Sequence, residues 1–350
     1  MAGVVVNMNF CSPLKLRSGL TGKYHAICHF SYNLPLGVIK KKPRMKFEII
    51  VNNIFDDIKL DNTLSPTDNK SVLGIINDFE NGEWRYEKFQ NFVWNNIMET
   101  ALSHSERKAL LDDGAGSILA ESAKKLRLVE SVDAIGRGSE IAEIVLYGIM
   151  KDHYSALPIV PKIFYKQNTG DEAKGSDSVH IVVESEDSFS LWFGESKFYN
   201  SIENARLDTI VASVKDSVSL VKIKKENSII TNLSDINDFD EISDDLKAKI
   251  KASLSQDESI DKIKPILNIP ILLLYECEQT KLGTDLTEEY KQGIIDYHKD
   301  RATQYFKKQI QKCNDVHLYE KIKFHIILFP IADKDKIVDK FIQIAKAYRD

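Results

Sequence analysis

The chain has 350 residues, with 47 Lys and Arg against 52 Asp and Glu, so it is long enough for one large domain or two ordinary ones. Its 43% of hydrophobic and 28% of charged residues are typical of a folded protein and exclude wholesale disorder. The net charge of −5 argues against a protein that binds nucleic acid by long-range electrostatic attraction alone. An enzyme acting on nucleic acid would need a local basic groove, or a partner that holds the polymer.

The sequence shows no signal for export or membrane insertion. It has no basic segment leading into a long apolar run at its beginning, and no stretch reaches about 18 apolar residues. The four cysteines lie far apart and form no CxxC pair, which favours reduced thiols over a zinc site. We therefore expect a cytoplasmic protein that does not enter a membrane.

The first third of the chain mixes strand-like and helical patterns. The runs "KYHAICHFSYN" and "MKFEIIVNNIF" predict strands, whereas residues from about 85 to 128 have apolar side chains at helical spacing, as in "YEKFQNFVWNNIMETAL". No motif in this part indicates a chemical activity. We therefore expect an α+β accessory region over residues 1–128 and the functional domain over residues 129–350.

From about residue 136 the order of the elements becomes informative. The segment "GSEIAEIVLYGIM" predicts a helix, "KIFYKQ" a strand, and "SDSVHIVVE" with "FSLWFGESKFY" a hairpin. A long helix follows from about residue 200, and the charge-rich residues 234–262 indicate a solvated insertion. The continuous apolar run "NIPILLLYE" is typical of a central strand covered on both faces. A further helix, the strand "KIKFHIILFPI" and a closing helix complete an α/β pattern with a mixed sheet.

The predicted hairpin brings two acids opposite each other. Side chains alternate along a strand, so folding about Glu186 pairs apolar residues three times on one face: Val183 with Phe189, Ile181 with Leu191, and Val179 with Phe193. The same face then ends in Asp177 across from Glu195. Lys197 lies one step beyond on this face. This regular pairing favours the register over a slip by one residue.

Two carboxylates that face each other across a sheet repel. At a separation of about 4 Å they cost about 4 kcal/mol at an effective dielectric constant of about 20. They are tolerated if one takes up a proton, if Lys197 compensates alone, or if a divalent cation binds them. Mg²⁺ (or Mn²⁺) prefers oxygen ligands, and held by Asp177 and Glu195 it would bind a phosphodiester. Lys197 would then orient water or neutralise charge on the phosphate, which predicts a metal-dependent phosphodiesterase.

Four further residues are candidates for supporting roles. Glu143 lies on a helix that is apolar nearly all round, where a carboxylate is either paired or functional, and Glu140 shares its direction as the alternative. Lys174, in the loop before the hairpin, is placed to reach a phosphate, although a loop lysine is commonly plain surface. His180 projects to the face away from the acids, beside Trp192, where a core histidine is expected more than a ligand.

At these residues the chain resembles the PD-(D/E)xK nuclease superfamily, whose restriction-endonuclease-like core is αβββαβ. The segment "GSD", ending at Asp177, and "ESK" at 195–197 occupy the motif positions, with serine in place of proline. More narrowly, four blocks resemble the HamA family, the nuclease subunits of the Hachiman anti-phage defence system: "RGSEIAEIVLYGIM", "PIVPKIFYK", "KGSDSVHIVV" and "LWFGESKFYN". The resemblance covers about residues 135–350.

The resemblance implies a metal-dependent DNA endonuclease that is restrained by a superfamily 2 helicase subunit of the HamB type until DNA is engaged. It implies Asp177 and Glu195 as metal ligands, Lys197 as the catalytic lysine, and Glu143 or else Glu140 as the helix acid. Two alternatives stay open. One is an enzyme that acts on RNA or as a site-specific restriction subunit. The other is a non-catalytic assembly or inhibitory subunit of a helicase complex.

Overall fold

The computed structural model describes seven segments: residues 45–52, 64–110, 112–128, 138–163, 175–232, 242–255 and 257–350. All of them belong to one compact unit, Lys42–Asp350, and the other unit of the chain, Met1–Lys41, lies outside the described residues. The description below concerns the larger unit alone.

Its strands form a mixed seven-stranded sheet with the order β1-β2-β9-β8-β7-β6-β5, beside a small ribbon of β3 and β4. The strands are β1 (Glu48–Asn52), β2 (Lys70–Ile76), β3 (Phe79–Glu80), β4 (Glu83–Trp84), β5 (Leu157–Val160), β6 (Ser178–Ser185), β7 (Ser188–Tyr199), β8 (Leu267–Glu276) and β9 (Lys323–Ile331). Strands β7, β8, β9 and β2 run parallel, whereas β1 is antiparallel to β2, and β6 is antiparallel to both β5 and β7. The expected α/β fold with a mixed sheet is therefore confirmed.

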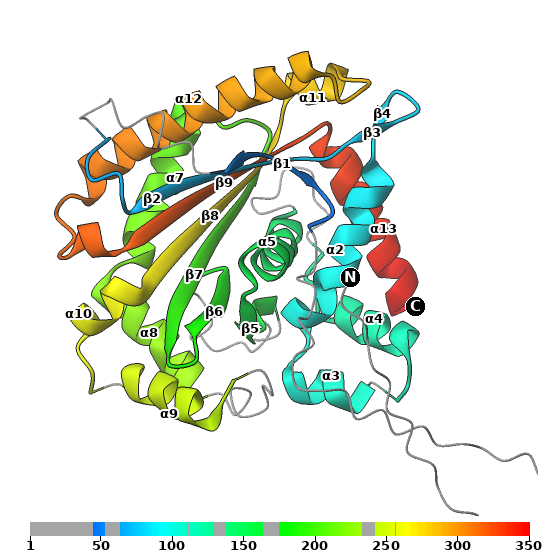
Figure 1. Cartoon of the computed structure of the whole chain (residues 1–350). Helices are drawn as coiled ribbons and strands as arrows, with labels where there is room; N and C mark the ends of the chain where they lie inside the picture. The colour runs from blue at the N-terminus through cyan, green and yellow to red at the C-terminus, as the bar shows by residue number, and fades with distance from the viewer. Residues whose placement is uncertain are drawn as a thin grey trace, which may run out of the picture. The chain divides into compact units, whose positions relative to one another are not determined.

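Helices cover both faces of the sheet (Figure 1). They are α2 (Tyr86–Ala101), α3 (His104–Leu110), α4 (Ala115–Lys124), α5 (Ser139–Tyr154), α7 (Asn204–Ser217), α8 (Leu220–Asn232), α9 (Asp244–Ser253), α10 (Ile260–Ile263), α11 (Glu278–Leu282), α12 (Glu288–Cys313) and α13 (Lys334–Arg349). Helices α7, α8, α9, α10 and α12 contribute to the core on one face, and α2, α4, α5 and α13 to the core on the other. We call these the α7 face and the α5 face.

The two central elements are buried as their apolar sequences predict. Nine of the ten residues of β8 are buried, because the strand has parallel neighbours on both sides and helices on both faces. Helix α5 is buried without interruption over residues 141–150, between the sheet and α2. Gly148 permits this close packing, since a Cβ atom there would overlap the ring of Phe92.

Two expectations for the elements were wrong. Strand β5 is formed by "LPIV", and Lys162 and Ile163 of the expected strand "KIFYKQ" are helical instead. β5 is the edge strand, and there Pro158, which lacks a backbone N–H, is tolerated. The charge-rich residues 234–262 include α9, which buries its apolar side in the core, so this part is not merely a solvated insertion.

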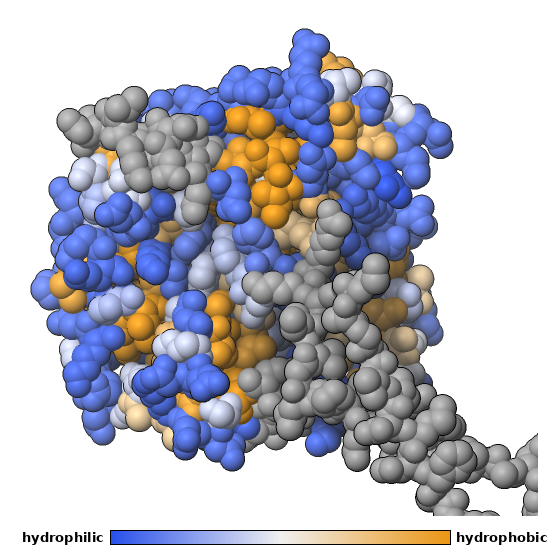
Figure 2. All heavy atoms as spheres, in the orientation of Figure 1, coloured by the Kyte–Doolittle hydropathy of each residue, from blue (hydrophilic) through white to orange (hydrophobic). Residues whose placement is uncertain are grey.

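The described residues on both sides of residue 128 share one sheet. β2 pairs with β9, and β1 continues the sheet beyond β2, while α2 packs on α5. The division into residues 1–128 and 129–350 stays a prediction. Figure 2 shows apolar side chains gathered over β1, where Ile49 is 36% exposed, next to the hydrophilic surface of α12. None of the described helices combines the length and apolar character needed to cross a membrane.

Candidate active site

The hairpin of β6 and β7 has the register that the apolar pattern predicts. The three apolar pairs are confirmed: Val179 with Phe193, Ile181 with Leu191, and Val183 with Phe189. The register shifts only next to the turn, between Val183 and Ser185. Asp177 directly precedes β6, and its backbone N–H donates at 2.8 Å to the carbonyl of Gly194, the residue that pairs with Ser178. The hairpin therefore brings Asp177 to the level of Glu195.

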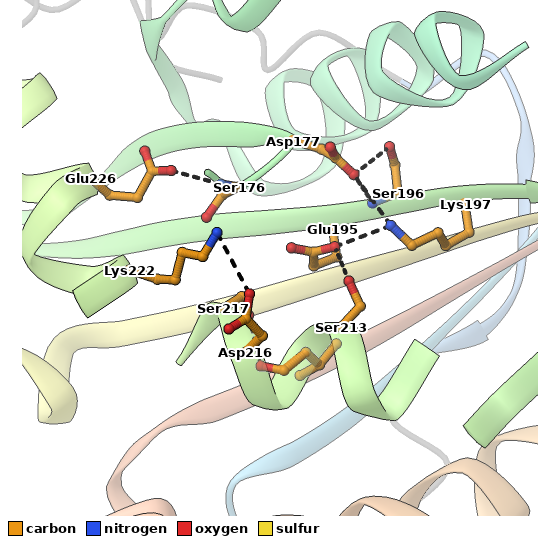
Figure 3. Close-up of polar contacts among 11 residues, drawn as sticks. Ser176, Asp177, Glu195, Ser196, Lys197, Ser213, Asp216, Ser217, Lys222 and Glu226 are labelled. Carbon is orange, nitrogen blue, oxygen red and sulfur yellow. Dashed lines mark hydrogen bonds and ion pairs between the residues drawn. The ribbon is translucent and has the colours of Figure 1, made fainter. Parts of the chain in front are cut away.

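One lysine lies between the two carboxylates (Figure 3). The Nζ atom of Lys197 is 3.2 Å from Oε2 of Glu195 and 3.8 Å from Oδ2 of Asp177. The Glu195 side chain is 8% exposed, against 19% for Asp177 and 24% for Lys197. The group is therefore buried at the glutamate and reaches solvent at the other two side chains.

Two serines fix the carboxylates in place. The backbone N–H of Ser196 donates to Oδ2 of Asp177 at 2.9 Å, and its hydroxyl lies 3.3 Å from the same atom. The Ser213 hydroxyl, on α7, donates to Oε2 of Glu195 at 2.9 Å. Ser213 is not among the site residues that the sequence predicts. Its one signal is a hydroxyl among the apolar positions by which α7 faces the sheet, next to the buried Val214.

The charges within this group are not balanced. Burial and, to a smaller extent, the negative charge of Asp177 raise the pKa of Glu195 to about 7, against the opposing effects of Lys197 and Ser213. Burial disfavours the charged form of Lys197, but the two carboxylates together outweigh it and raise the pKa of the lysine. One cation thus serves two anions, and the more buried anion still resists ionisation.

A pocket of about 320 Å³ adjoins the group on the α7 face. Its lining comes from the hairpin and from the two helices that follow: Gly175, Ser176, Asp177, Glu195, Lys197, Ser213, Asp216, Ser217 and Lys222. Across the pocket from Glu195, the Nζ atom of Lys222 lies 3.5 Å from Oδ2 of Asp216 (Figure 3). A polar pocket with two ammonium groups, beside carboxylates that can hold a cation, is suited to a phosphate-containing ligand.

A second lysine–carboxylate pair lies behind the pocket, and the sequence reasoning missed it. Lys162 and Glu226 are each 1% exposed, and their Nζ and Oε2 atoms are 2.6 Å apart. The other carboxylate oxygen of Glu226 accepts the backbone N–H of Ser176 at 2.6 Å (Figure 3). Glu226 lies three residues after Ile223 and four before Ile230, both fully buried, so helical spacing puts this acid on the apolar side of α8.

The predicted helix acids lie apart from the pocket lining. Glu143 is buried on α5 near Tyr147, whose pKa is raised by burial and, to a smaller extent, by the charges of Glu143 and Glu226. Glu140 accepts the backbone N–H groups of Arg127 and Leu128, at 2.8 and 3.3 Å, so its carboxylate holds the chain after α4. Neither acid belongs to the described residues that line the pocket.

The two remaining candidates differ in what the structure says of them. His180 is 1% exposed on the α5 face, opposite the face of the acids. It pairs with Trp192 in the sheet, and its ring lies 4.4 Å from that of Tyr147. Burial lowers its pKa to about 3, as expected of a neutral core histidine. Lys174 lies outside the described residues.

The two carboxylates of the pocket fit a divalent cation. They are hard oxygen ligands, they carry more negative charge than Lys197 neutralises, and both of them line a polar pocket. Within the described segments there is no group of three or more His, Cys, Asp or Glu side chains arranged for a metal ion. A cation here would take two protein ligands, and water and phosphate oxygens would fill its other positions, as is common for Mg²⁺.

Comparison with known proteins identifies the family. A model of the HamA family matches residues 52–345, which is most of the chain and begins within the region expected to be accessory. A search of curated proteins found no match. The family match agrees with the motif blocks around the hairpin and extends beyond them at both ends. The chain therefore belongs to the HamA family and is a component of a Hachiman anti-phage defence system.

Proposed function

We propose that this chain is the metal-dependent DNA nuclease of its defence system, with Asp177, Glu195 and Lys197 as its active site. One observation carries the proposal: the register of β6 and β7 places two carboxylates around one lysine at the wall of a polar pocket. The order α5, β5, β6, β7, α7, β8 agrees with a restriction-endonuclease-like αβββαβ core. That agreement supports the same assignment.

Each side chain has a distinct role in this proposal. Asp177 and Glu195 hold Mg²⁺ or Mn²⁺, while the hydrogen bonds from Ser196 and Ser213 keep their oxygens in place. A cation bound there would supply Lewis-acid stabilisation of the charge that develops on the phosphate. Lys197 donates hydrogen bonds to the attacking water or to a phosphate oxygen, and its raised pKa keeps it protonated at neutral pH.

DNA binding requires more than this pocket. The chain has a net charge of −5, so long-range attraction to DNA must come from elsewhere. We propose that a superfamily 2 helicase subunit supplies it, delivers DNA to the pocket in the cytoplasm, and restrains cleavage until then. The proposal favours cleavage with little sequence preference, because the lining offers contacts to phosphate rather than an array for reading bases.

The test is cleavage by the chain purified together with its partner subunits. Supercoiled plasmid, linear DNA and RNA of matched length are each incubated with ATP and either Mg²⁺ or EDTA. We expect Mg²⁺-dependent cleavage of DNA that Glu195→Gln abolishes and Glu186→Gln retains. Glu186 is a suitable control because it is an exposed acid in the turn of the same hairpin.

Three results would contradict the proposal. Equal cleavage in EDTA would exclude the metal site, and preferred cleavage of RNA would favour the ribonuclease alternative. A Glu195→Gln/Lys197→Met double variant that protects cells from phage as well as the wild type would show a non-catalytic role.

A further inference from the structure

The buried pair of Lys162 and Glu226 requires an explanation. Removing two charges from water costs several kcal/mol for each ion, and pairing them seldom repays more than this. Replacing such a pair with apolar residues of similar volume is often neutral or stabilising. Stability alone therefore gives little reason for a fully buried pair between α8 and the segment after β5.

The carboxylate of Glu226 makes a second contact, to the backbone next to Asp177. While one oxygen of Glu226 contacts Lys162, the other accepts the backbone N–H of Ser176, which is 3% exposed. A Cβ atom at Gly175 would overlap this second oxygen, so glycine leaves the space that the contact needs. Glu226 thus holds the two residues that directly precede Asp177.

The backbone of Asp177 is consequently held from both sides. Ser176 is bonded to α8 through Glu226, and the N–H of Asp177 is bonded to Gly194 of β7. Rotation of the backbone between these two bonds would move the Asp177 carboxylate away from Ser196 and Lys197. Loss of a residue that positions a metal ligand without contacting the metal commonly lowers metal affinity by about 10-fold to 100-fold.

We infer that Glu226 is a positioning residue, which fixes the backbone at Ser176 so that Asp177 and Glu195 bind one divalent cation together. Lys162 contacts one oxygen of Glu226 and leaves the other aimed at Ser176. The inference rests on the proposed function, since it assigns Glu226 to the metal site of that proposal. It concerns a residue outside the pocket lining and outside the PD-(D/E)xK motif.

Two double variants separate positioning from stability. In Lys162→Met/Glu226→Gln the buried charges are gone, but the glutamine carbonyl still accepts from Ser176. In Lys162→Met/Glu226→Leu the charges are gone and the acceptor is gone as well. The two proteins differ only in the hydrogen bond to Ser176, because both lack the ion pair.

The measurement is Mn²⁺ binding by electron paramagnetic resonance on the full chain, with Glu195→Gln defining the binding that does not belong to the site. We expect the Gln variant to bind Mn²⁺ within about threefold of the wild type and the Leu variant to bind about 10-fold more weakly. Equal affinities of the two double variants would overturn the inference. Lys264→Met is the control for loss of a buried lysine, since Lys264 contacts Asp261 and His317 away from the pocket, and should leave Mn²⁺ affinity unchanged.

A third variant protects the test from a folding defect. If thermal unfolding shows that the Leu variant is not folded at the assay temperature, Gly175→Ala decides, because it displaces the Glu226 oxygen without removing a buried charge. We expect it to weaken Mn²⁺ binding at least fivefold, and unchanged binding would overturn the inference. If the wild type shows no Mn²⁺ binding that depends on Glu195, the proposed metal site itself is wrong. If the wild type binds Mn²⁺ through Glu195 but the affinity does not depend on the contact to Ser176, only the inference about Glu226 is wrong.

Discussion

Two lysine–carboxylate clusters flank the loop at residues 175–177, and they are built differently. Lys162 and Glu226 form an ion pair in which both side chains are 1% exposed. Lys197 serves two carboxylates, Asp177 and Glu195, and this cluster opens onto a pocket. The first cluster is neutral and closed, whereas the second carries excess negative charge and is accessible.

The contrast indicates which cluster is suited to a ligand. A neutral buried pair has neither charge nor space for a cation, so its oxygens serve the protein's own backbone, as the contact to Ser176 shows. A cluster with one negative charge in excess is stabilised by a cation from solvent. Charge balance together with access, rather than the presence of a lysine beside an acid, distinguishes the proposed site from the structural pair.

The largest effect on DNA cleavage should come from removing the ammonium group of Lys197 from the open cluster, which is Asp177, Glu195 and Lys197. Lys197→Met is expected to lower the rate of DNA cleavage by the partner-bound chain about a thousandfold, or about 4 kcal/mol, because it removes the ammonium group that lies between Asp177 and Glu195. Lys215→Met, which removes a surface lysine of α7 that pairs with Asp315, should cleave normally. Single-turnover rates with plasmid measure the effect, and equal loss in both variants would contradict it.

In the closed cluster, which is Lys162 and Glu226, loss of the lysine should have a large effect on the stability of the fold. Lys162→Met leaves the buried carboxylate of Glu226 without its lysine and is expected to lower the free energy of unfolding by about 3 kcal/mol. Lys197→Met should lower it by less than about 1 kcal/mol, since that cluster is partly exposed. Urea unfolding followed by circular dichroism compares them. If Lys197→Met proves the more destabilising change, the distinction between the clusters is wrong.

Neutralising the more buried acid of the open cluster should stabilise the metal-free chain. Folding raises the pKa of Glu195 to about 7, from about 4.5 in the unfolded chain, so the folded state disfavours the ionised acid. The resulting penalty is absent below pH 4.5, grows as the pH rises, and is complete above about pH 7. Glu195→Gln should therefore raise the free energy of unfolding in EDTA by about 3 kcal/mol at pH 8 and not at pH 4.5.

The smallest effect should come from a single hydroxyl of the open cluster. Ser213→Ala removes one hydrogen bond to the Glu195 carboxylate and is expected to slow cleavage about tenfold, or about 1.4 kcal/mol. Thr209→Ala, one turn earlier on the same helix and exposed, should leave the rate unchanged. A rate for Ser213→Ala equal to that of the control would show that Glu195 does not depend on α7 for its position.

The open cluster was predictable from the sequence because a hairpin obeys a period of two. The apolar pairs fixed the register, and the register brought together Asp177 and Glu195, which are near in the chain. The mixed α/β sheet followed in the same way from the order of the apolar runs. These are local patterns, which a single sequence records directly.

The closed cluster was not predictable, because its residues come from segments that lie far apart in the chain. Glu226 meets Ser176 and Lys162 across gaps of 50 and 64 residues. Helical spacing puts Glu226 on the buried side of α8 but does not specify its partners, and the segment containing Lys162 was predicted as a strand, although β5 ends before it. Contacts of this kind depend on how α8 packs against the sheet, which hydrophobic periodicity leaves undetermined.

The alternation of side chains between the two faces of the hairpin has a consequence for insertions. Because one continuous hairpin joins the two carboxylates, an odd number of residues inserted into either strand would turn every side chain beyond the insertion to the opposite face of the sheet. One acid would then point towards α5 while the other still pointed towards α7. Substitutions that keep these strands apolar leave the acids facing each other, whereas a single-residue insertion separates them even though every motif residue is still present.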